Sequence, residues 1–170
     1  MLNPPKLIGH RGVKSLSPEN TLNSIKLAHK LGLKWIEIDV KISKDLVPIL
    51  LHDDTLERTT NGKGFPTDFN YADLQKLDAG FSFYNYFTKI RIPTLKQVLS
   101  FCKKNEIGLN IELKPNLGFE KSTVEAIAKL LINFNFTNQY YFSSFDWSSV
   151  VLMKKFLPNA YYGLLIDEFN

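Results

Sequence analysis

Residues 35–53 read WIEIDVKISKDLVPILLHD, and this stretch decides how the chain folds. Its first half alternates with period two, so Glu37 and Asp39 share one face of a strand while isoleucines and a valine line the other. A second apolar run, residues 48–51, follows after about six residues, whereas a parallel crossover needs roughly a dozen. The two runs are therefore predicted to form an antiparallel hairpin that turns at residues 43–46.

The turn of this hairpin decides which residues face each other. If the turn is centred on Lys44 and Asp45, residue numbers across the ladder add up to about 89, which places His52 opposite Glu37. Two carboxylates and an imidazole would then meet, although the packing of a core does not require them there. We therefore interpret the hairpin as part of a functional site.

The composition limits the class of protein. With 170 residues, 44% of them hydrophobic and 22% charged, the chain fits one globular domain with a real core. The net charge is +4, but the lysines are dispersed, which favours a solvated surface over a nucleic-acid groove. A mildly basic surface still favours an anionic small-molecule substrate.

The sequence also favours a soluble protein in the cytoplasm. Cys102 is the only cysteine, so no intrachain disulfide can form, and we expect it to be buried. The first ten residues contain two prolines and no apolar signal core. No run approaches about 18 consecutive apolar residues, so we expect no stable membrane anchor.

Strands and helices alternate along most of the chain, which predicts a parallel sheet. Strands are expected at residues 6–10, 35–40, 107–114, 139–145 and 160–165. Helices are expected at about residues 21–32, 94–104, 124–131 and 146–156. Polar groups near strand ends, and the lack of a glycine-rich dinucleotide fingerprint, favour a (β/α) barrel over an open doubly wound sheet.

Residues 54–93 interrupt this alternation. They contain a short predicted helix near residues 71–77 and a group of aromatic residues at 81–87. Because disordered segments lack aromatics, we interpret residues 54–93 as an insertion with its own small core, within a single domain of residues 1–170. We expect the aromatic side chains to pack in that core rather than to contact a ligand.

Charged and imidazole side chains gather near the C-terminal ends of the predicted strands, the rim that carries the active site in such barrels. These residues are His10, Arg11, Glu37, Asp39, His52, Glu112 and Lys114. A surface ion pair or a core hydrogen bond explains any one of them. Their convergence on one rim favours a functional site.

The side chains on this rim suit phosphate chemistry. The carboxylates of Glu37, Asp39 and Glu112 are hard oxygen ligands, which fit Mg²⁺ or Ca²⁺ better than zinc. Zinc would prefer the two histidines and is the lesser alternative. A divalent cation beside Arg11 and Lys114 would bind a phosphate, while two histidines supply a base and an acid near neutral pH. The constellation predicts cleavage of a phosphate ester.

Eight short motifs occur in order and carry a resemblance to a known family. They are LIGHRG (7–12), PENT (18–21), EIDV (37–40), KD (44–45), HD (52–53), TTNG (59–62), IPTL (92–95) and ELK (112–114). Together they resemble the glycerophosphodiester phosphodiesterase family from about residue 6 to the end of the chain. The His-Arg-Gly, Glu-x-Asp and His-Asp elements are the most specific of these.

The resemblance implies a TIM-barrel hydrolase with an insertion after its second strand. Such an enzyme would convert glycerophosphodiesters into glycerol 3-phosphate and an alcohol, within glycerol and lipid metabolism. The roles that it implies are metal binding by Glu37, Asp39 and Glu112, general base for His10, general acid for His52, and phosphate binding by Arg11 and Lys114. Asn20 is expected to shape the first loop or cap a helix.

Two departures from the family pattern are visible. Leu46 stands where the family usually has glycine, and a positive φ there would cost roughly 1 kcal/mol. A TIM barrel typically needs about 250 residues, and only about five of its eight strands can be counted here. We expect an incomplete barrel with open edges: a fragment, a subunit closed by another copy in a homo-oligomer, or a degenerate relative.

Two other functions fit the same residues. One is a related phospholipase D-like enzyme that acts on lysophospholipids or sphingolipids. The other is a truncated relative that binds phosphodiesters, or a partner, without cleaving them.

Overall fold

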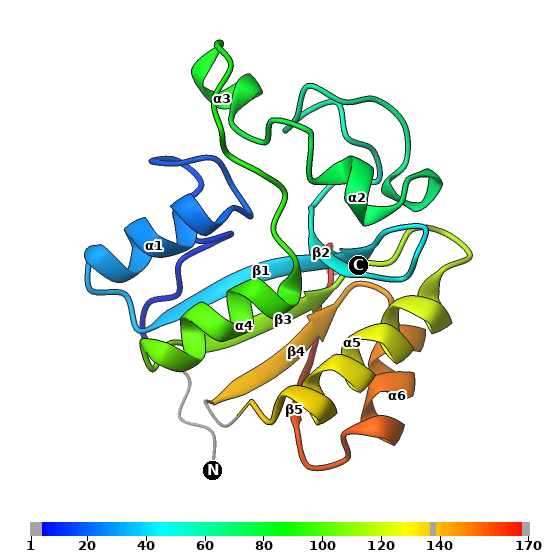
Figure 1. Cartoon of the computed structure of the whole chain (residues 1–170). Coiled ribbons are helices and arrows are strands. Elements are labelled where there is room, and N and C mark those ends of the chain that lie inside the picture. Colours follow the sequence, from blue (N-terminus) through cyan, green and yellow to red (C-terminus); the bar gives the residue numbers. More distant parts are fainter. Residues whose placement is uncertain (1–4, 137–138, 168–170) are drawn as a thin grey trace.

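The computed structural model of the chain describes residues 5–136 and 139–167 (Figure 1). In this part, one sheet has the strand order β2-β1-β3-β4-β5. These strands are β2 (Pro48–Leu50), β1 (Trp35–Ile42), β3 (Gly108–Leu113), β4 (Tyr140–Ser144) and β5 (Tyr161–Leu164). Strands β1, β3, β4 and β5 run parallel, and β2 pairs antiparallel with β1. The longer helices are α1 (Leu22–Lys30), α4 (Leu95–Lys104), α5 (Glu120–Phe134) and α6 (Trp147–Phe156).

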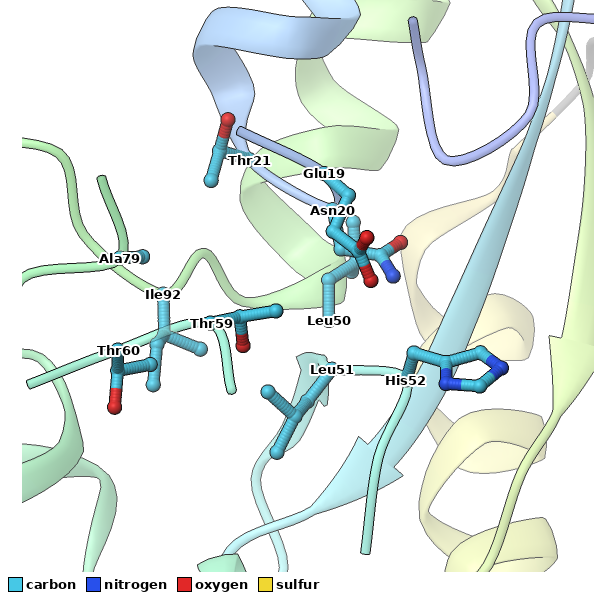
Figure 2. A pocket seen from close by; sticks show the side chains of 10 residues that line it. All are labelled: Glu19, Asn20, Thr21, Leu50, Leu51, His52, Thr59, Thr60, Ala79 and Ile92. Atoms are coloured by element: carbon cyan, nitrogen blue, oxygen red, sulfur yellow. The ribbon is translucent and has the colours of Figure 1, made fainter. Parts of the chain in front are cut away.

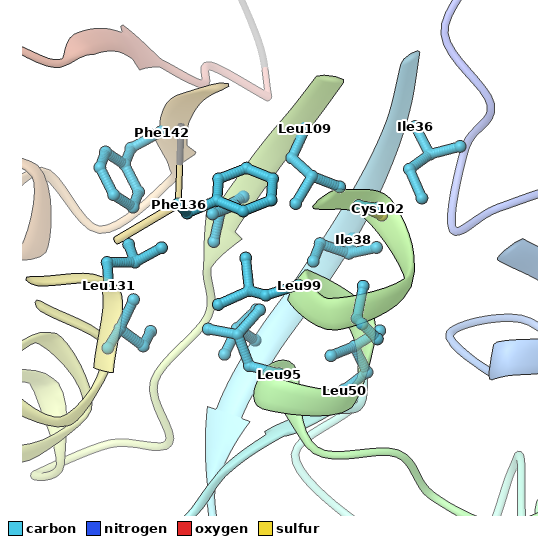
Figure 3. Close-up of a cluster of buried hydrophobic side chains, with 14 of the residues drawn as sticks. Ile36, Ile38, Leu50, Leu95, Leu99, Cys102, Leu109, Leu131, Phe136 and Phe142 are labelled. Atoms are coloured by element: carbon cyan, nitrogen blue, oxygen red, sulfur yellow. The ribbon is translucent and has the colours of Figure 1, made fainter. Parts of the chain in front are cut away.

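The four longer helices cover one face of this sheet. Ile36 and Ile38 of β1, Leu109 of β3 and Phe142 of β4 pack in one buried cluster with apolar residues of α1, α4, α5 and α6 (Figure 3). An open doubly wound sheet carries helices on both faces. Parallel strands that are neighbours in both sequence and space, with helices on one side only, are typical of a (β/α) barrel. The predicted incomplete barrel is therefore confirmed.

The first predicted strand, residues 6–10, is reduced to a single bridge between Gly9 and Ile36. The chain leaves the sheet directly afterwards, because Arg11 and Gly12 both adopt a positive φ, of 53° and 83°. A Cβ on Gly12 would lie 2.5 Å from the Oγ of Ser24. Glycine at position 12 thus lets the first loop fold back closely over α1.

The hairpin forms as predicted, but its register differs by one residue. Val40 pairs with Leu50, so paired residue numbers add up to 90, and the ladder ends there. Leu46 adopts φ 60° and adds a third residue to the turn, which is closed by the backbone N–H of Ser43 donating to the carbonyl of Val47. The predicted pairing of His52 with Glu37 is therefore wrong.

Replacing Leu46 by glycine is expected to stabilise the fold. Its side chain is about half exposed, so little packing is lost, and relief of the left-handed conformation should add about 0.5–1 kcal/mol to the free energy of unfolding. Chemical denaturation measures this change. Leu31→Gly is the control, because Leu31 is equally exposed but has φ −79°, and this variant should lose stability. Equal losses in both variants would contradict the strain argument.

Residues 54–93 contain one short 3₁₀ helix and two short α-helices: η1 (Pro66–Asp68), α2 (Tyr71–Leu74) and α3 (Phe81–Tyr84). Four residues of this segment form a small buried cluster together with Ile49 and Leu51 of the preceding hairpin; they are Leu56, Leu74, Ala79 and Ile92. The aromatic residues of 81–87 are not in it. The prediction that they pack in the core is wrong, because short aliphatic side chains fill that space.

The helix ends and Cys102 agree with the sequence patterns. Thr94 forms a capping box with Gln97 at the start of α4, and Thr21 caps α1 through its hydroxyl. Cys102 is fully buried, and this burial raises the pKa of its thiol to about 12. No helix in the described ranges has both the length and the apolar character needed to cross a bilayer.

Candidate functional site

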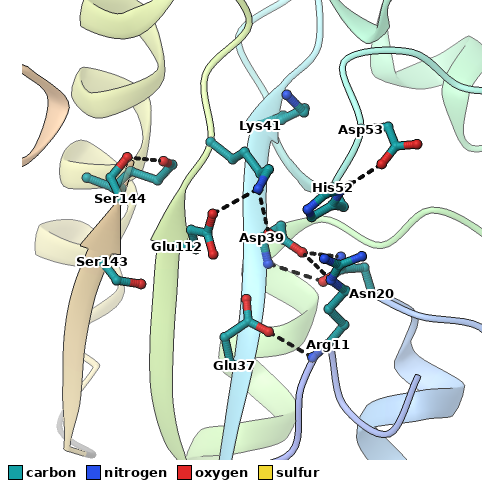
Figure 4. Close-up of polar contacts among 12 residues, drawn as sticks. Arg11, Asn20, Glu37, Asp39, Lys41, His52, Asp53, Glu112, Ser143 and Ser144 are labelled. Carbon is teal, nitrogen blue, oxygen red and sulfur yellow. Dashed lines mark hydrogen bonds and ion pairs between the residues drawn. The ribbon is translucent and has the colours of Figure 1, made fainter. Parts of the chain in front are cut away.

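The three predicted metal ligands come together on the face of the sheet opposite the helices (Figure 4). Glu37 and Asp39 project from β1, and Glu112 of β3 pairs directly with Asp39 across the parallel ladder. One carboxylate oxygen of each lies within 4.8 Å of the others, and all three residues are buried. The period-two alternation in residues 35–42 is what places them together, since the intervening residues point into the core.

This cluster is electrostatically costly without a cation. Burial, then the neighbouring charge of Asp39, raises the pKa of Glu37 to about 8. The buried Oε1 of Glu37 and Oδ1 of Asp39 accept no hydrogen bond from any residue that the structure describes. Buried acceptors without donors are rare, and a divalent cation would satisfy both of them. The donor set therefore fits a hard cation.

Lys114 contacts the carboxylates rather than standing free. Its Nζ lies 2.9 Å from Oε1 of Glu112 and 3.7 Å from Oδ1 of Asp39, so the ammonium group partly compensates their charge. The ring of Phe145 lies 5.6 Å from the same nitrogen. Lys114 is thus placed between the carboxylate cluster and an exposed aromatic side chain.

Arg11 is also engaged with acidic side chains. Its Nη1 donates to Glu19 at 2.8 Å, its Nε lies 3.2 Å from Oδ2 of Asp39, and its backbone N–H donates to Glu37 at 2.8 Å. Asn20 also binds the Asp39 carboxylate, because its Nδ2 donates to Oδ2 of Asp39 at 2.8 Å. Asn20 therefore anchors a cluster residue, while Thr21 forms the helix cap.

The two predicted catalytic histidines have different partners. His10 is half exposed, and its Nε2 lies 3.8 Å from Oε2 of Glu37. Partial burial, then the charge of Arg11, lowers the pKa of His10. His52 is hydrogen-bonded through Nδ1 to Oδ1 of Asp53 at 2.6 Å. It lines a narrow cavity together with Glu19 and Asn20 (Figure 2).

Arg58 joins the two sides of this site, and the sequence analysis missed it. Its guanidinium donates two hydrogen bonds to Asp53, at 2.6 and 2.8 Å, and two to Glu19, at 2.6 and 3.0 Å. These bonds hold the pKa of Asp53 well below its usual range. Glu19 in turn binds Arg11, so one chain of ion pairs runs from Arg11 to His52. Arg58 lies five residues after Asp53, in the predicted insertion, and no sequence motif indicated this role.

Replacing Arg58 by alanine is expected to raise the pKa of Asp53 towards the ordinary value of about 4. The Arg58 hydrogen bonds are the largest cause of the shift, and NMR titration of the Asp53 carboxyl carbon measures it. A depressed pKa adds stability above the unfolded-state value and loses it as the pH falls through the folded-state value. The stability difference between parent and variant should therefore shrink in acid.

Lys76→Ala is the control for this change. Lys76 forms an exposed ion pair with Asp73 on another part of the surface, so its loss should leave the Asp53 titration unchanged. An unaltered Asp53 pKa in Arg58→Ala would contradict the assigned geometry.

Comparison with known proteins gives consistent results. Residues 10–169 match the glycerophosphoryl diester phosphodiesterase family. The chain is 38% identical, over 159 residues, to a glycerophosphodiester phosphodiesterase of Caldanaerobacter subterraneus, covering 94% of this chain and 65% of that protein. It is 41% identical, over 156 residues, to the putative glycerophosphodiester phosphodiesterase YhdW of Bacillus subtilis, covering 90% of this chain and 62% of that protein. The chain thus spans less than two thirds of these relatives' lengths.

Solved structures show the same relationship. An Oleispira antarctica phosphodiesterase in complex with the product sn-glycerol-3-phosphate superposes with a TM-score of 0.91 at 38% identity, covering 95% of this chain and 66% of that one. A glycerophosphodiester phosphodiesterase from Agrobacterium tumefaciens gives 0.80 at 30% identity, covering 91% of this chain and 64% of that one. The described part of the present chain has the fold of these proteins.

Proposed function

Because the chain belongs to the glycerophosphoryl diester phosphodiesterase family, we propose that it hydrolyses glycerophosphodiesters to sn-glycerol 3-phosphate and an alcohol. The observation that carries this proposal is the buried cluster of Glu37, Asp39 and Glu112 with basic side chains around it. The similar Oleispira structure contains sn-glycerol-3-phosphate as product. In this proposal residues 54–93 are an insertion within a single domain.

Glu37, Asp39 and Glu112 are the residues that would hold the divalent cation, Mg²⁺ or Ca²⁺. When bound, a cation of this kind polarises a phosphoryl oxygen and offsets the charge that develops on it. Lys114, whose ammonium group lies beside Glu112 and Asp39, would bind the phosphate. Arg11, already fixed by Glu19, would bind the same phosphate through its guanidinium.

The histidines would divide the proton transfers. His10, half exposed beside Glu37, would take a proton from the attacking group, which is either water or a neighbouring glycerol hydroxyl. His52 would donate a hydrogen bond from its Nδ1–H to the Asp53 carboxylate, which orients the ring so that Nε2–H can protonate the leaving alcohol. Arg58 holds Asp53 in that position from the other side, so we assign it a positioning role.

An assay on a panel of diesters tests the proposed function. The metal-stripped protein is supplied with Mg²⁺ or Ca²⁺ and offered glycerophosphocholine, glycerophosphoethanolamine and lysophosphatidylcholine. We expect metal-dependent release of glycerol 3-phosphate from the first two. Faster turnover of the lysophospholipid would favour the phospholipase D-like alternative.

The mass of the assembled species is measured beside the assay, because another copy could cover the open edge at β5. Metal binding without hydrolysis in every assembly state would overturn the proposal in favour of a non-catalytic relative. A phosphomonoester serves as the negative substrate, since its hydrolysis would indicate a contaminating phosphatase.

A further inference from the structure

Four aromatic side chains at and after α3 are exposed together. They form what we call the aromatic tip: Phe83, Tyr84, Tyr86 and Phe87, with exposed fractions of 42%, 38%, 61% and 72%. Three of these rings are neighbours: the ring centroids of Phe83 and Tyr84 lie 4.9 Å apart, and those of Tyr84 and Tyr86 lie 5.6 Å apart. Single exposed apolar residues are common on proteins, but a contiguous exposed group marks an interaction surface.

The aromatic tip is a built structure that projects from the protein. Figure 1 shows α3 at the outer edge of the molecule, away from the sheet. Asn85 adopts φ 58° and reverses the chain, which brings Phe87 back to 4.9 Å from Phe81. The base of the loop is closed by buried Asp78, whose carboxylate accepts hydrogen bonds from Gly80 and Thr88. The rings are therefore presented on a fixed support.

Basic side chains lie near the aromatic tip and line two different cavities. Lys89 and Arg91 line one of them together with Lys26 of α1, and Lys14 lines the other. Residues 80–93 contain Lys89 and Arg91 and no acidic residue. Phe83 lines a cavity of about 170 Å³ together with Lys14 of the first loop, and with Glu19 and Arg58. Glu19 is bound by Arg11 and Arg58, and Arg58 is also bound by Asp53, so these charges offset one another. Lys14 is the cation of this cavity that these ion pairs do not include.

We propose that the aromatic tip docks the protein reversibly on an anionic phospholipid surface. Phenylalanine and tyrosine side chains are favoured at the membrane–water interface, where the ring is buried and the tyrosine hydroxyl stays hydrated. Lysine and arginine beside them are attracted to anionic headgroups. An anionic headgroup layer would pair with these cations while the rings enter the interface, so we commit to the lipid surface and treat a second copy of the chain as an outcome of the test.

The docking surface continues to the candidate site. The cavity beside Phe83 is also lined by Glu19 and Arg58, which belong to the chain of ion pairs that ends at His52. Docking through the aromatic tip would therefore hold that cavity close to the lipid headgroups. The docking itself does not depend on the proposed hydrolysis, so binding can be tested without any turnover.

Flotation with lipid vesicles tests the proposal. The protein is mixed at low salt with vesicles of phosphatidylcholine, or of phosphatidylcholine with phosphatidylglycerol. We expect binding to the anionic vesicles, weakening as salt is added. The double variant Tyr86→Ser with Phe87→Ser should bind at least about tenfold more weakly, because two rings no longer enter the interface. Lys14→Gln and Lys89→Gln should each cost about fivefold.

The control is the double variant Ile132→Ser with Val151→Ser. These residues on α5 and α6 are 57% and 60% exposed, so the control removes similar exposed apolar groups away from the aromatic tip. It should bind as the parent does, and circular dichroism confirms that each variant is folded.

Three outcomes would overturn the proposal. They are no vesicle binding by the parent, equal binding to both kinds of vesicle, and unchanged binding by the folded Tyr86/Phe87 variant. Sedimentation in the absence of lipid tests the alternative that a second copy of the chain binds the aromatic tip. If the parent forms an oligomer that the Tyr86/Phe87 variant loses, a second copy covers the aromatic tip and the lipid proposal is wrong.

Discussion

Glu37→Gln is expected to abolish stabilisation of the protein by divalent cations. The parent should unfold at a higher temperature when Mg²⁺ or Ca²⁺ is added, gaining about 2.7 kcal/mol at a hundredfold excess over the dissociation constant. The variant should gain almost nothing, because it lacks one of three carboxylates that lie within 4.8 Å of one another. Hydrolysis should fall at least about a hundredfold if several kcal/mol of charge stabilisation are lost.

Without metal, Glu37→Gln should be more stable than the parent. In the metal-free protein, burial and the charge of Asp39 oppose ionisation of Glu37, so a neutral amide of the same shape should make the fold more stable. Differential scanning calorimetry with a chelator, then with added cation, measures both effects. Glu125→Gln on α5 is the control, since it removes a more exposed carboxylate that forms an ion pair with Lys121. A metal response that survives in Glu37→Gln would refute the assigned ligand set.

His52→Ala should lose hydrolysis of alkyl diesters such as glycerophosphocholine by roughly 10²–10⁴-fold. An alkyl alcohol is a poor leaving group and needs a proton, which we propose that His52 donates. A p-nitrophenyl phosphodiester releases a phenolate that leaves without protonation, so the loss on that substrate should be much smaller. Steady-state rates on the two substrates measure the difference.

Comparison with the other histidines makes this test specific. His10→Ala should slow both substrates to a similar degree, because a base is needed whatever group leaves. His29→Ala is the control, since His29 lies on α1 and packs edge-on against Phe101. Equal losses on both substrates in His52→Ala would contradict its assignment as the acid.

The elements that the sequence predicts well are those with strong periodicity. The alternation around Glu37 and Asp39 correctly placed both carboxylates on one face, and Thr94 correctly marked the start of α4. In both cases the pattern is local and the burial of one face enforces it. The three metal-ligand candidates meet as expected because parallel neighbouring strands bring equivalent positions side by side.

The misses have physical causes that a single sequence does not display. Leu46 adopts the left-handed conformation and lengthens the turn by one residue, which shifts the hairpin register by one. Because side chains alternate with a period of two, a shift of one residue changes which residues face each other. Asn20 and Arg58 contact residues that are distant in sequence, Asp39 for the one and Glu19 for the other. The aromatic residues of 81–87 look like core by composition, yet aliphatic residues already fill that volume.

Arg58 also has a consequence for how the protein opens. It ties Glu19 of the first loop to Asp53, 34 positions further along the chain, through a single guanidinium group. Neither loop can move far while these bonds persist, so amide protons in both should exchange with solvent as one cooperative unit. The candidate site would then lose its order in a single step rather than one loop at a time.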